Sequence, residues 1–172
     1  SEKDLALELE FFLKKNADDI AFSPIVAFGK NAAIPHYLPN NNQHITDNSL
    51  ILLDFGAKKN GYCADMTRVI FYKTPPETLV EIYNTVLKAQ ELALDKIRVG
   101  KTGMDIDKIA REYIISQGYP QYPHGLGHGV GLAIHEAPRL RIGSADKLLD
   151  NMVVTVEPGI YMPGECGVRI ED

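Results

Sequence analysis

Residues 50–72 read LILLDFGAKKNGYCADMTRVIFY, two largely apolar stretches separated by the tetrapeptide Lys58-Lys59-Asn60-Gly61. An Asn-Gly pair between apolar stretches is a strong signal for a tight β-hairpin turn. We therefore predict two antiparallel strands, near residues 50–57 and 62–72. Asp54 and Asp65 fall on opposite arms, where cross-strand pairing brings Cβ atoms to within about 5 Å, or a little further on a diagonal. The hairpin thus predicts two carboxylates held close together.

Two further carboxylates follow apolar segments near the end of the sequence. Glu157 follows residues 152–156, and Glu171 follows residues 167–170. Removing a carboxylate from water is costly unless a positive group meets it. Any one of these acidic residues alone is compatible with an exposed strand position, but all of them together indicate that a cation balances their charge.

Two polar residues share a strand face with a proposed carboxylate. Thr67 lies two residues after Asp65, and Arg169 lies two residues before Glu171. Residues two apart in a strand point to the same side of the sheet. We therefore expect the Thr67 hydroxyl to orient Asp65, and Arg169 to lie beside Glu171.

Residues 124–136, HGLGHGVGLAIHE, carry glycine at every second position from 125 to 131, and histidine at 124, 128 and 135. In an extended chain this alternation places His124 and His128 on one face and leaves the other face bare. The spacing is not that of a dinucleotide-binding glycine motif, and the chain contains neither H-E-x-x-H nor G-x-S-x-G. A lone histidine here would more often be structural, whereas a histidine group beside a carboxylate cluster indicates a functional site.

Charge counting indicates how many metal ions such a site would hold. Asp54, Asp65, Glu157 and Glu171 contribute four negative charges, which two divalent ions balance, and a neutral His128 adds a nitrogen ligand. Oxygen-rich ligation with one histidine suits manganese, cobalt, iron or zinc better than a thiolate-preferring ion. A pair of such ions would activate a water molecule and polarise a carbonyl, so the expected chemistry is metal-assisted hydrolysis.

The remaining segments predict an α+β protein with two similar halves, each a sheet layer covered by helices. Helical periodicity, proline at a helix start and glycine after a helix end define the helices. We predict helices over Ser1–Lys15, about Pro76–Ile97 and about Asp105–Gln117, further strands at Ile20–Phe28 and near 126–134, 152–161 and 167–171, and a polar surface loop at 38–49.

Length and charge exclude several classes of protein. With 172 residues the chain is long enough for one buried core, and its net charge of −5 argues against a nucleic-acid partner. No stretch approaches the roughly 20 apolar residues of a membrane span. Two cysteines make no disulfide framework, which fits a reducing compartment. We therefore expect a cytoplasmic protein without nucleic-acid or membrane partners.

Several motifs extend the argument beyond residue chemistry: Ile34-Pro35-His36-Tyr37, Leu53-Asp54-Phe55-Gly56-Ala57, Ala64-Asp65-Met66-Thr67-Arg68, residues 124–136, Val156-Glu157-Pro158-Gly159-Ile160-Tyr161 and Gly167-Val168-Arg169-Ile170-Glu171-Asp172. In this order they resemble those of the pita-bread (creatinase/aminopeptidase-like) metallopeptidases, in particular the Xaa-Pro aminopeptidase and Xaa-Pro dipeptidase (prolidase) branch. The resemblance covers essentially the whole chain. It implies a pita-bread fold, in which two similar halves form a curved antiparallel sheet covered by helices.

The resemblance also implies a ligand set for two divalent metal ions, Mn²⁺ or Co²⁺ in the first place and Zn²⁺ or Fe²⁺ as alternatives. In the family pattern Asp65 and Glu171 bridge the two ions and Asp54 completes one site. His128 and Glu157 complete the other.

Further roles come with the same resemblance. His36, His124 and His135 match active-site histidines that contact substrate and stabilise the tetrahedral intermediate. Glu157 has a proton-transfer role as well, and Arg169 holds the side of the cluster formed by Glu171 and Asp54. The implied reaction is hydrolysis of the bond between an N-terminal residue and a following proline, a tertiary amide without an N–H. The implied substrates are proline-containing peptides or dipeptides, and the full-length form is expected to be a homodimer.

Family members usually carry an additional N-terminal domain and continue beyond the position of Glu171. We therefore expect residues 1–172 to be a single catalytic domain, a fragment that lacks the N-terminal domain and the extreme C-terminal strand. Two alternatives share the fold: a methionine aminopeptidase-like enzyme and a non-catalytic peptidase-like binding module. The segment 124–136 and Glu157-Pro158-Gly159-Ile160-Tyr161 favour the proline branch, and the intact ligand set favours an enzyme.

Overall fold

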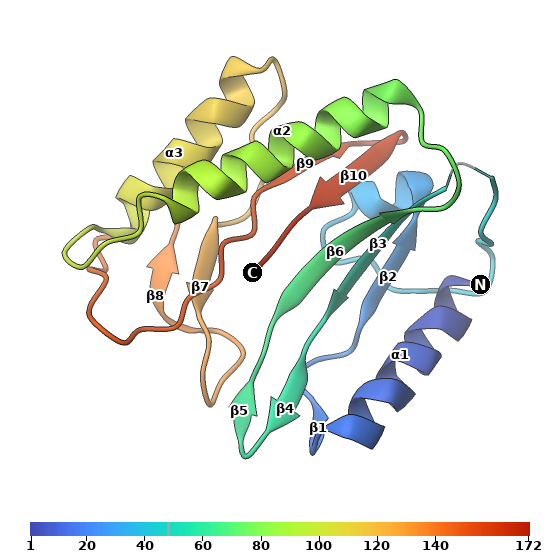
Figure 1. Cartoon of the computed structure of the whole chain (residues 1–172), viewed down its shortest axis with the longest axis horizontal. Coiled ribbons are helices and arrows are strands. Elements are labelled where there is room, and N and C mark those ends of the chain that lie inside the picture. Colours follow the sequence, from blue (N-terminus) through green and yellow to red (C-terminus); the bar gives the residue numbers. More distant parts are fainter. Residues whose placement is uncertain (48) are drawn as a thin grey trace.

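The computed structural model describes residues 1–47 and 49–172 and has an α+β architecture in two halves (Figure 1). The first half contains α1 (Glu2–Asn16), β1 (Asp19–Ile20), β2 (Ile25–Phe28), the 3-10 helix η1 (Gly29–Ala33), β3 (Leu50–Phe55), β4 (Ala57–Lys59), β5 (Tyr62–Cys63) and β6 (Met66–Phe71). The second half contains α2 (Glu77–Leu94), α3 (Gly103–Ser116), β7 (Gly127–Gly129), β8 (Glu136–Leu140), β9 (Gly159–Met162) and β10 (Cys166–Arg169).

The predicted hairpin is confirmed. Asp54 pairs with Thr67 in the β3–β6 ladder, and Lys58 pairs with Cys63 in the β4–β5 ladder, which continues the same register. The turn residues Asn60 and Gly61 both have positive φ, +51° and +84°, as a two-residue type I′ turn requires. Asn-Gly therefore sets the register that places the two aspartates.

The predicted strand Ile20–Phe28 is wrong as a single element. It is interrupted around Pro24, and its two parts join different sheets: β1 pairs with β4, whereas β2 pairs with β3. Proline lacks the N–H that a continuous ladder would need. In the predicted loop 38–49, residues 38–47 form turns and irregular chain, and Asn48 lies outside the described residues.

The helices confirm their predictions with small shifts at the ends. The α3 helix begins two residues earlier than predicted, because Thr102 and Asp105 form a reciprocal capping box. The α2 helix buries the apolar side that its periodicity indicated, through Ile82, Val86, Ala89 and Ala93. Both helices lie over the second half, α2 against β9 and β10 and α3 against β8, while α1 packs on β2 (Figure 1). None of the described helices is long and apolar enough to cross a membrane.

Strand predictions in the second half are less accurate. The segment 126–134 forms a strand only at β7, and 152–161 only at β9, with an isolated bridge between Val154 and Gly129. Strand β8 was not predicted. One core nevertheless joins the halves, and its buried members include Leu50, Leu52, Val86, Ile106, Leu126, Ile160 and Val168.

Candidate metal centre and active site

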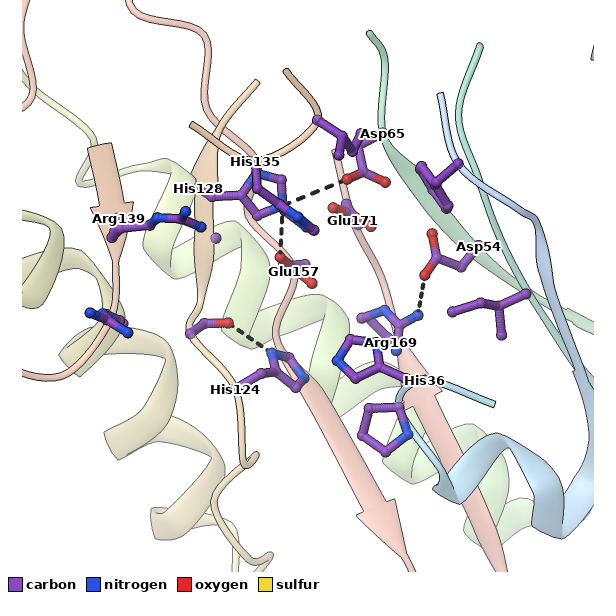
Figure 2. Close-up of a pocket in the computed structure, with 17 residues that line it drawn as sticks. His36, Asp54, Asp65, His124, His128, His135, Arg139, Glu157, Arg169 and Glu171 are labelled. Carbon is purple, nitrogen blue, oxygen red and sulfur yellow. Dashed lines mark hydrogen bonds and ion pairs between the residues drawn. The ribbon is translucent and has the colours of Figure 1, made fainter. Parts of the chain in front are cut away.

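A cavity of about 370 Å³ opens between the two halves of the chain (Figure 2). All the predicted site residues line it. His36, Asp54 and Asp65 come from the first half, and the second half contributes His124, His128, His135, Glu157, Arg169 and Glu171. Only Asp54 lies inside a strand, whereas the other acidic residues stand just before or after one. The cavity therefore unites side chains that are far apart in the sequence.

The two aspartates lie on a diagonal of the hairpin. Asp54 on β3 faces Thr67, and Asp65 precedes β6 by one residue, opposite Gly56 if the same register is continued. A Cβ atom on Gly56 would lie 1.9 Å from the carbonyl oxygen of Ala64, so only glycine allows the two arms to approach here. The close approach keeps Asp65 beside Asp54.

Arg169 connects several members of the cluster. Its Nη2 donates to Asp54 Oδ2 at 2.6 Å, its Nε donates to Thr67 Oγ1 at 3.0 Å, and its Nη1 donates to Tyr161 Oη at 3.0 Å. The expectation that Arg169 holds the Asp54 side agrees with these contacts. It reaches Glu171 through the Thr67 hydroxyl.

The expectation for Thr67 itself is wrong. Its hydroxyl donates to Glu171 Oε2 at 2.7 Å and has no hydrogen bond to Asp65 among the described residues. The reason is tertiary: the backbone of Glu171 forms a β-bridge with Thr67, which brings that carboxylate to the hydroxyl. Because Arg169 Nε donates to Thr67 Oγ1, this oxygen accepts from Arg169 and its own proton is directed at Glu171.

His128 presents a nitrogen lone pair to the carboxylates. Its Nδ1 lies 3.0 Å from the carbonyl oxygen of Gly129, which can only accept, so Nδ1 carries the proton. Its Nε2 lies 3.4 Å from Glu157 Oε1 and 3.6 Å from Asp65 Oδ2. Burial lowers the pKa of His128, which keeps the ring neutral. A ring whose Nδ1–H bonds a backbone carbonyl and whose Nε2 lone pair faces carboxylate oxygens is suited to bind a cation that lies between them.

Burial raises the pKa of every carboxylate in the cluster, and repulsion by neighbouring carboxylates raises those of Asp65, Glu157 and Glu171 further. Burial, followed by the charges of Glu171 and Asp54, raises the pKa of Asp65 to about 8. Burial and then the Asp54 charge raise the pKa of Glu171 to about 7. Burial likewise raises the pKa of Asp54 and raises that of Glu157 well above its usual range. Such groups repel one another when ionised, and a bound cation would reverse that repulsion.

The donor set fits a pair of metal ions. Ligand atoms of Asp54, Asp65 and Glu171 lie within 4.8 Å of one another, as do those of His128, Glu157 and Glu171. Glu171 belongs to both groups and therefore stands between them. Asp54 Oδ1 is buried and has no hydrogen-bond partner among the described residues, so it is free to bind a cation.

The other histidines lie beside this cluster, and a ring nitrogen of His135 lies within 4.8 Å of ligand atoms of Asp65 and His128. His124 Nδ1 donates to the carbonyl oxygen of Gly125 at 2.7 Å, and its Nε2 accepts from Tyr161 Oη at 2.8 Å. Burial lowers the pKa of His124 to about 4, so the ring is neutral. The His135 ring packs edge-on against that of His128, with centroids 4.4 Å apart. His36 faces them from the first half (Figure 2).

Three polar residues at or beside the cavity were not identified from the sequence. Tyr161 is buried and links Arg169 to His124, and the only signal for it was its place in the Glu157–Tyr161 motif. Arg139 and Arg141 line the cavity with exposed side chains. Their spacing of two residues, at and just beyond the end of the unpredicted strand β8, was the available signal.

Comparisons with known proteins agree with this architecture. The sequence model of metallopeptidase family M24 matches residues 1–172. A peptidase of uncharacterised function from Bacillus subtilis is 44% identical over 174 residues, 100% of this chain and 49% of the relative. The chain therefore spans about half the length of the curated relatives it matches.

Solved structures give the same result. The Xaa-Pro dipeptidase from Bacillus anthracis has a TM-score of 0.96 and 46% identity, covering 100% of this chain and 49% of that one. An X-prolyl aminopeptidase from Caenorhabditis elegans, described as cytosolic with a di-nuclear active site, has a TM-score of 0.91 and 32% identity, covering 100% and 29%. The α+β pita-bread fold is confirmed.

Proposed function

This chain belongs to metallopeptidase family M24, and on that premise we propose that the protein hydrolyses the peptide bond between an N-terminal residue and a following proline. The observation that carries the proposal is the buried cluster of carboxylates around the His128 lone pair. The names of two relatives, an Xaa-Pro dipeptidase and an X-prolyl aminopeptidase, support the choice of proline substrates.

The proposed metal ligands are Asp54, Asp65, His128, Glu157 and Glu171, with Asp65 and Glu171 shared between two divalent ions. Manganese or cobalt is the proposed metal, with zinc or iron as alternatives, because the donors are mainly carboxylate oxygens. When bound, the ions supply a hydrolytic nucleophile at neutral pH and polarise the scissile carbonyl.

The chain's own residues position the ligands and handle protons. Arg169 and Thr67 hold Asp54 and Glu171 in place through the hydrogen bonds described above. We assign proton transfer to Glu157, a cavity carboxyl whose pKa burial raises: it would take a proton from the attacking water and pass it to the leaving proline nitrogen. His36 and His135 are proposed to contact the substrate from opposite walls of the cavity.

The cavity and its rim favour short substrates. A volume of about 370 Å³ accommodates a small ligand rather than a long chain. Arg139 and Arg141 form no ion pair with any residue in the described part of the chain, although both line the cavity. Guanidinium groups bind carboxylates well, so we propose that they receive the C-terminal carboxylate of a dipeptide. A cytoplasmic location and a homodimer stay predictions.

The test combines metal content with substrate choice. The protein, loaded with manganese or cobalt and desalted, should retain about two ions per chain by elemental analysis, as the charge balance requires. It should then hydrolyse Ala-Pro faster than Ala-Pro-Ala and leave Met-Ala intact, while the Glu157→Gln variant should be inactive. Preferential hydrolysis of Met-Ala would favour a methionine aminopeptidase-like enzyme, and absence of both metal and turnover would favour a binding module.

A further inference from the structure

A buried ion pair on α3 lies outside the candidate metal cluster. Asp107 and Arg111 are 1% and 7% exposed and are bidentate, with Nε–Oδ2 and Nη2–Oδ1 distances of 2.9 Å. The guanidinium also stacks on the ring of Tyr122, with Cζ 4.0 Å from the ring centroid. A buried ion pair is weak evidence for stability, since apolar residues of similar volume often serve the core as well or better. The hydrogen bonds of the ion pair to the backbone of residues 122–126 indicate its role.

The ion pair binds the main chain of alternate residues in the segment that precedes β7. Arg111 Nη1 donates to the carbonyl oxygen of Tyr122 at 2.7 Å, and Nη2 donates to that of His124 at 2.9 Å. The N–H of Leu126 donates to Asp107 Oδ1 at 3.0 Å. The antiparallel partner strand β8 pairs with this segment only from Gly127 onward. The ion pair therefore takes the place of a neighbouring strand along residues 122–126.

The last residue of the same segment also bonds the stretch of chain that carries a proposed ligand. The N–H of Glu157 donates to the carbonyl oxygen of Leu126 at 2.7 Å. Within this segment, both ring nitrogens of His124 are bonded, to Gly125 and to Tyr161. Since Gly125 is part of the segment held by Arg111, the position of the imidazole depends on that segment's backbone.

We infer that the Asp107–Arg111 ion pair is the positioning element that holds His124 in the active site. Arg111 uses its planar fork for four acceptors at once, two on Asp107 and two carbonyl oxygens. Lysine has a single nitrogen and cannot reproduce this arrangement. The catalytic part of this inference rests on the proposed function, whereas the placement of His124 does not.

The experiment measures the His124 ring directly and then its effect on turnover. In protein labelled with ¹⁵N-histidine, His124 should give the signature of a single neutral tautomer with the proton on Nδ1. Arg111→Ala and Arg111→Lys should convert this to a mixed-tautomer signal. Lys108→Ala, which removes an exposed positive charge from the same helix, should leave the signal unchanged. An unchanged His124 signal in both Arg111 variants would overturn the inference, whatever their activity.

Kinetics provide a second, independent readout. Arg111→Ala should lower kcat/KM by about 10-fold to 100-fold, as expected when a catalytic group is slightly misplaced. The metal content should stay as in the wild type, because no proposed metal ligand contacts the Arg111 side chain. In a His124→Ala background the same substitution should cost little further, since coupled residues are not additive. If the losses in kcat/KM of the two single variants multiply in the double variant, Arg111 has a general structural role and the catalytic part of the inference is overturned.

Added guanidinium supplies a rescue test. Arg111 also lines a second cavity of about 580 Å³, through which a small cation can reach the position of the deleted side chain. Guanidinium at millimolar concentration should restore both the tautomer signal and kcat/KM of Arg111→Ala, and should not change Lys108→Ala. A restored signal in a protein that never hydrolyses X-Pro peptides would support the positioning role and refute the proposed function. Failure to restore the signal would count against the positioning role.

Discussion

Replacing Asp65 with asparagine should stabilise the metal-free protein and at the same time remove its response to metal. Asp65 is crowded by Glu171 and Asp54, and burial together with these charges raises its pKa from 3.8 to about 8. The folded protein therefore binds a proton that the unfolded chain releases between about pH 4 and pH 8. Stability contributed by this proton is present at low pH and is lost as the pH rises through that window. Asparagine keeps the shape without the charge.

The magnitude follows from the same shift. One pKa unit corresponds to about 1.4 kcal/mol. Because Asp65 is only partly buried, water in the cavity screens part of the electrostatic cost of its ionisation. We therefore expect the free energy of unfolding of the variant to exceed that of the wild type by about 2 kcal/mol at about pH 9. The gain should become small at about pH 4, where the carboxyl is protonated in the folded wild type and about half protonated in the unfolded chain, and should disappear below that pH. With metal the order should reverse, since the wild type gains binding free energy that the variant lacks.

Urea denaturation at several pH values, with chelator and with manganese, measures these quantities. The wild type should be less stable than Asp65→Asn in chelator at high pH and more stable in manganese. Peptidase activity of the variant should be abolished. A variant that is less stable than the wild type in chelator at every pH would show that Asp65 is not repelled by its neighbours. A variant that gains as much stability from manganese as the wild type would show that Asp65 is not a ligand.

Three further changes test other parts of the site. Thr67→Val removes the hydroxyl between Arg169 and Glu171 and should weaken metal binding by about 10-fold to 100-fold in a calorimetric titration. Thr67→Ser should bind as the wild type does, and equal binding by the valine variant would refute the role of the hydroxyl. His135→Ala should lower turnover while leaving metal content nearly unchanged in elemental analysis; loss of metal would make it a ligand. Gly127→Ala places a Cβ atom 1.9 Å from the carbonyl oxygen of Thr155 and should destabilise the fold by about 3 kcal/mol in thermal unfolding. Gly164→Ala, whose added methyl meets no atom, should cost only about 1 kcal/mol for its left-handed backbone, and equal losses would refute the steric explanation.

Local patterns in the sequence predicted the parts of the fold that local physics controls. Asn60-Gly61 sets the hairpin because both residues accept positive φ, and the 82–93 periodicity sets the buried side of α2. In the glycine-rich region 124–136 the strand prediction was inaccurate: only Gly127–Gly129 of the predicted strand 126–134 forms a strand. Glycines carry no side chain whose pattern reveals a pairing partner, so the extent of β7 and the existence of β8 depend on neighbours elsewhere in the chain.

The candidate site also has features that the sequence predicted and features that it did not. Carboxylates and histidines beside apolar or glycine-rich segments could be recognised from sequence, because their burial is costly without a cation. Their partners could not be assigned. Thr67 was expected to orient Asp65, yet its hydroxyl binds Glu171, a residue 104 positions away. The Asp107–Arg111 pair gave no signal beyond ordinary helix spacing, although its bonds reach the backbone of residues 122–126.

The sequence by itself determined the donor atoms: which residues carry carboxylate or imidazole, and that their number suits two divalent ions. Tertiary structure alone decided which of these atoms meet, which proton points at which oxygen, and which charges raise the pKa of Asp65. The physical reason is the distance along the sequence over which each interaction acts. Period and turn signals act over a few residues, whereas the bridge between Thr67 and Glu171 and the contact between Arg169 and Asp54 form only when the two halves close on one core.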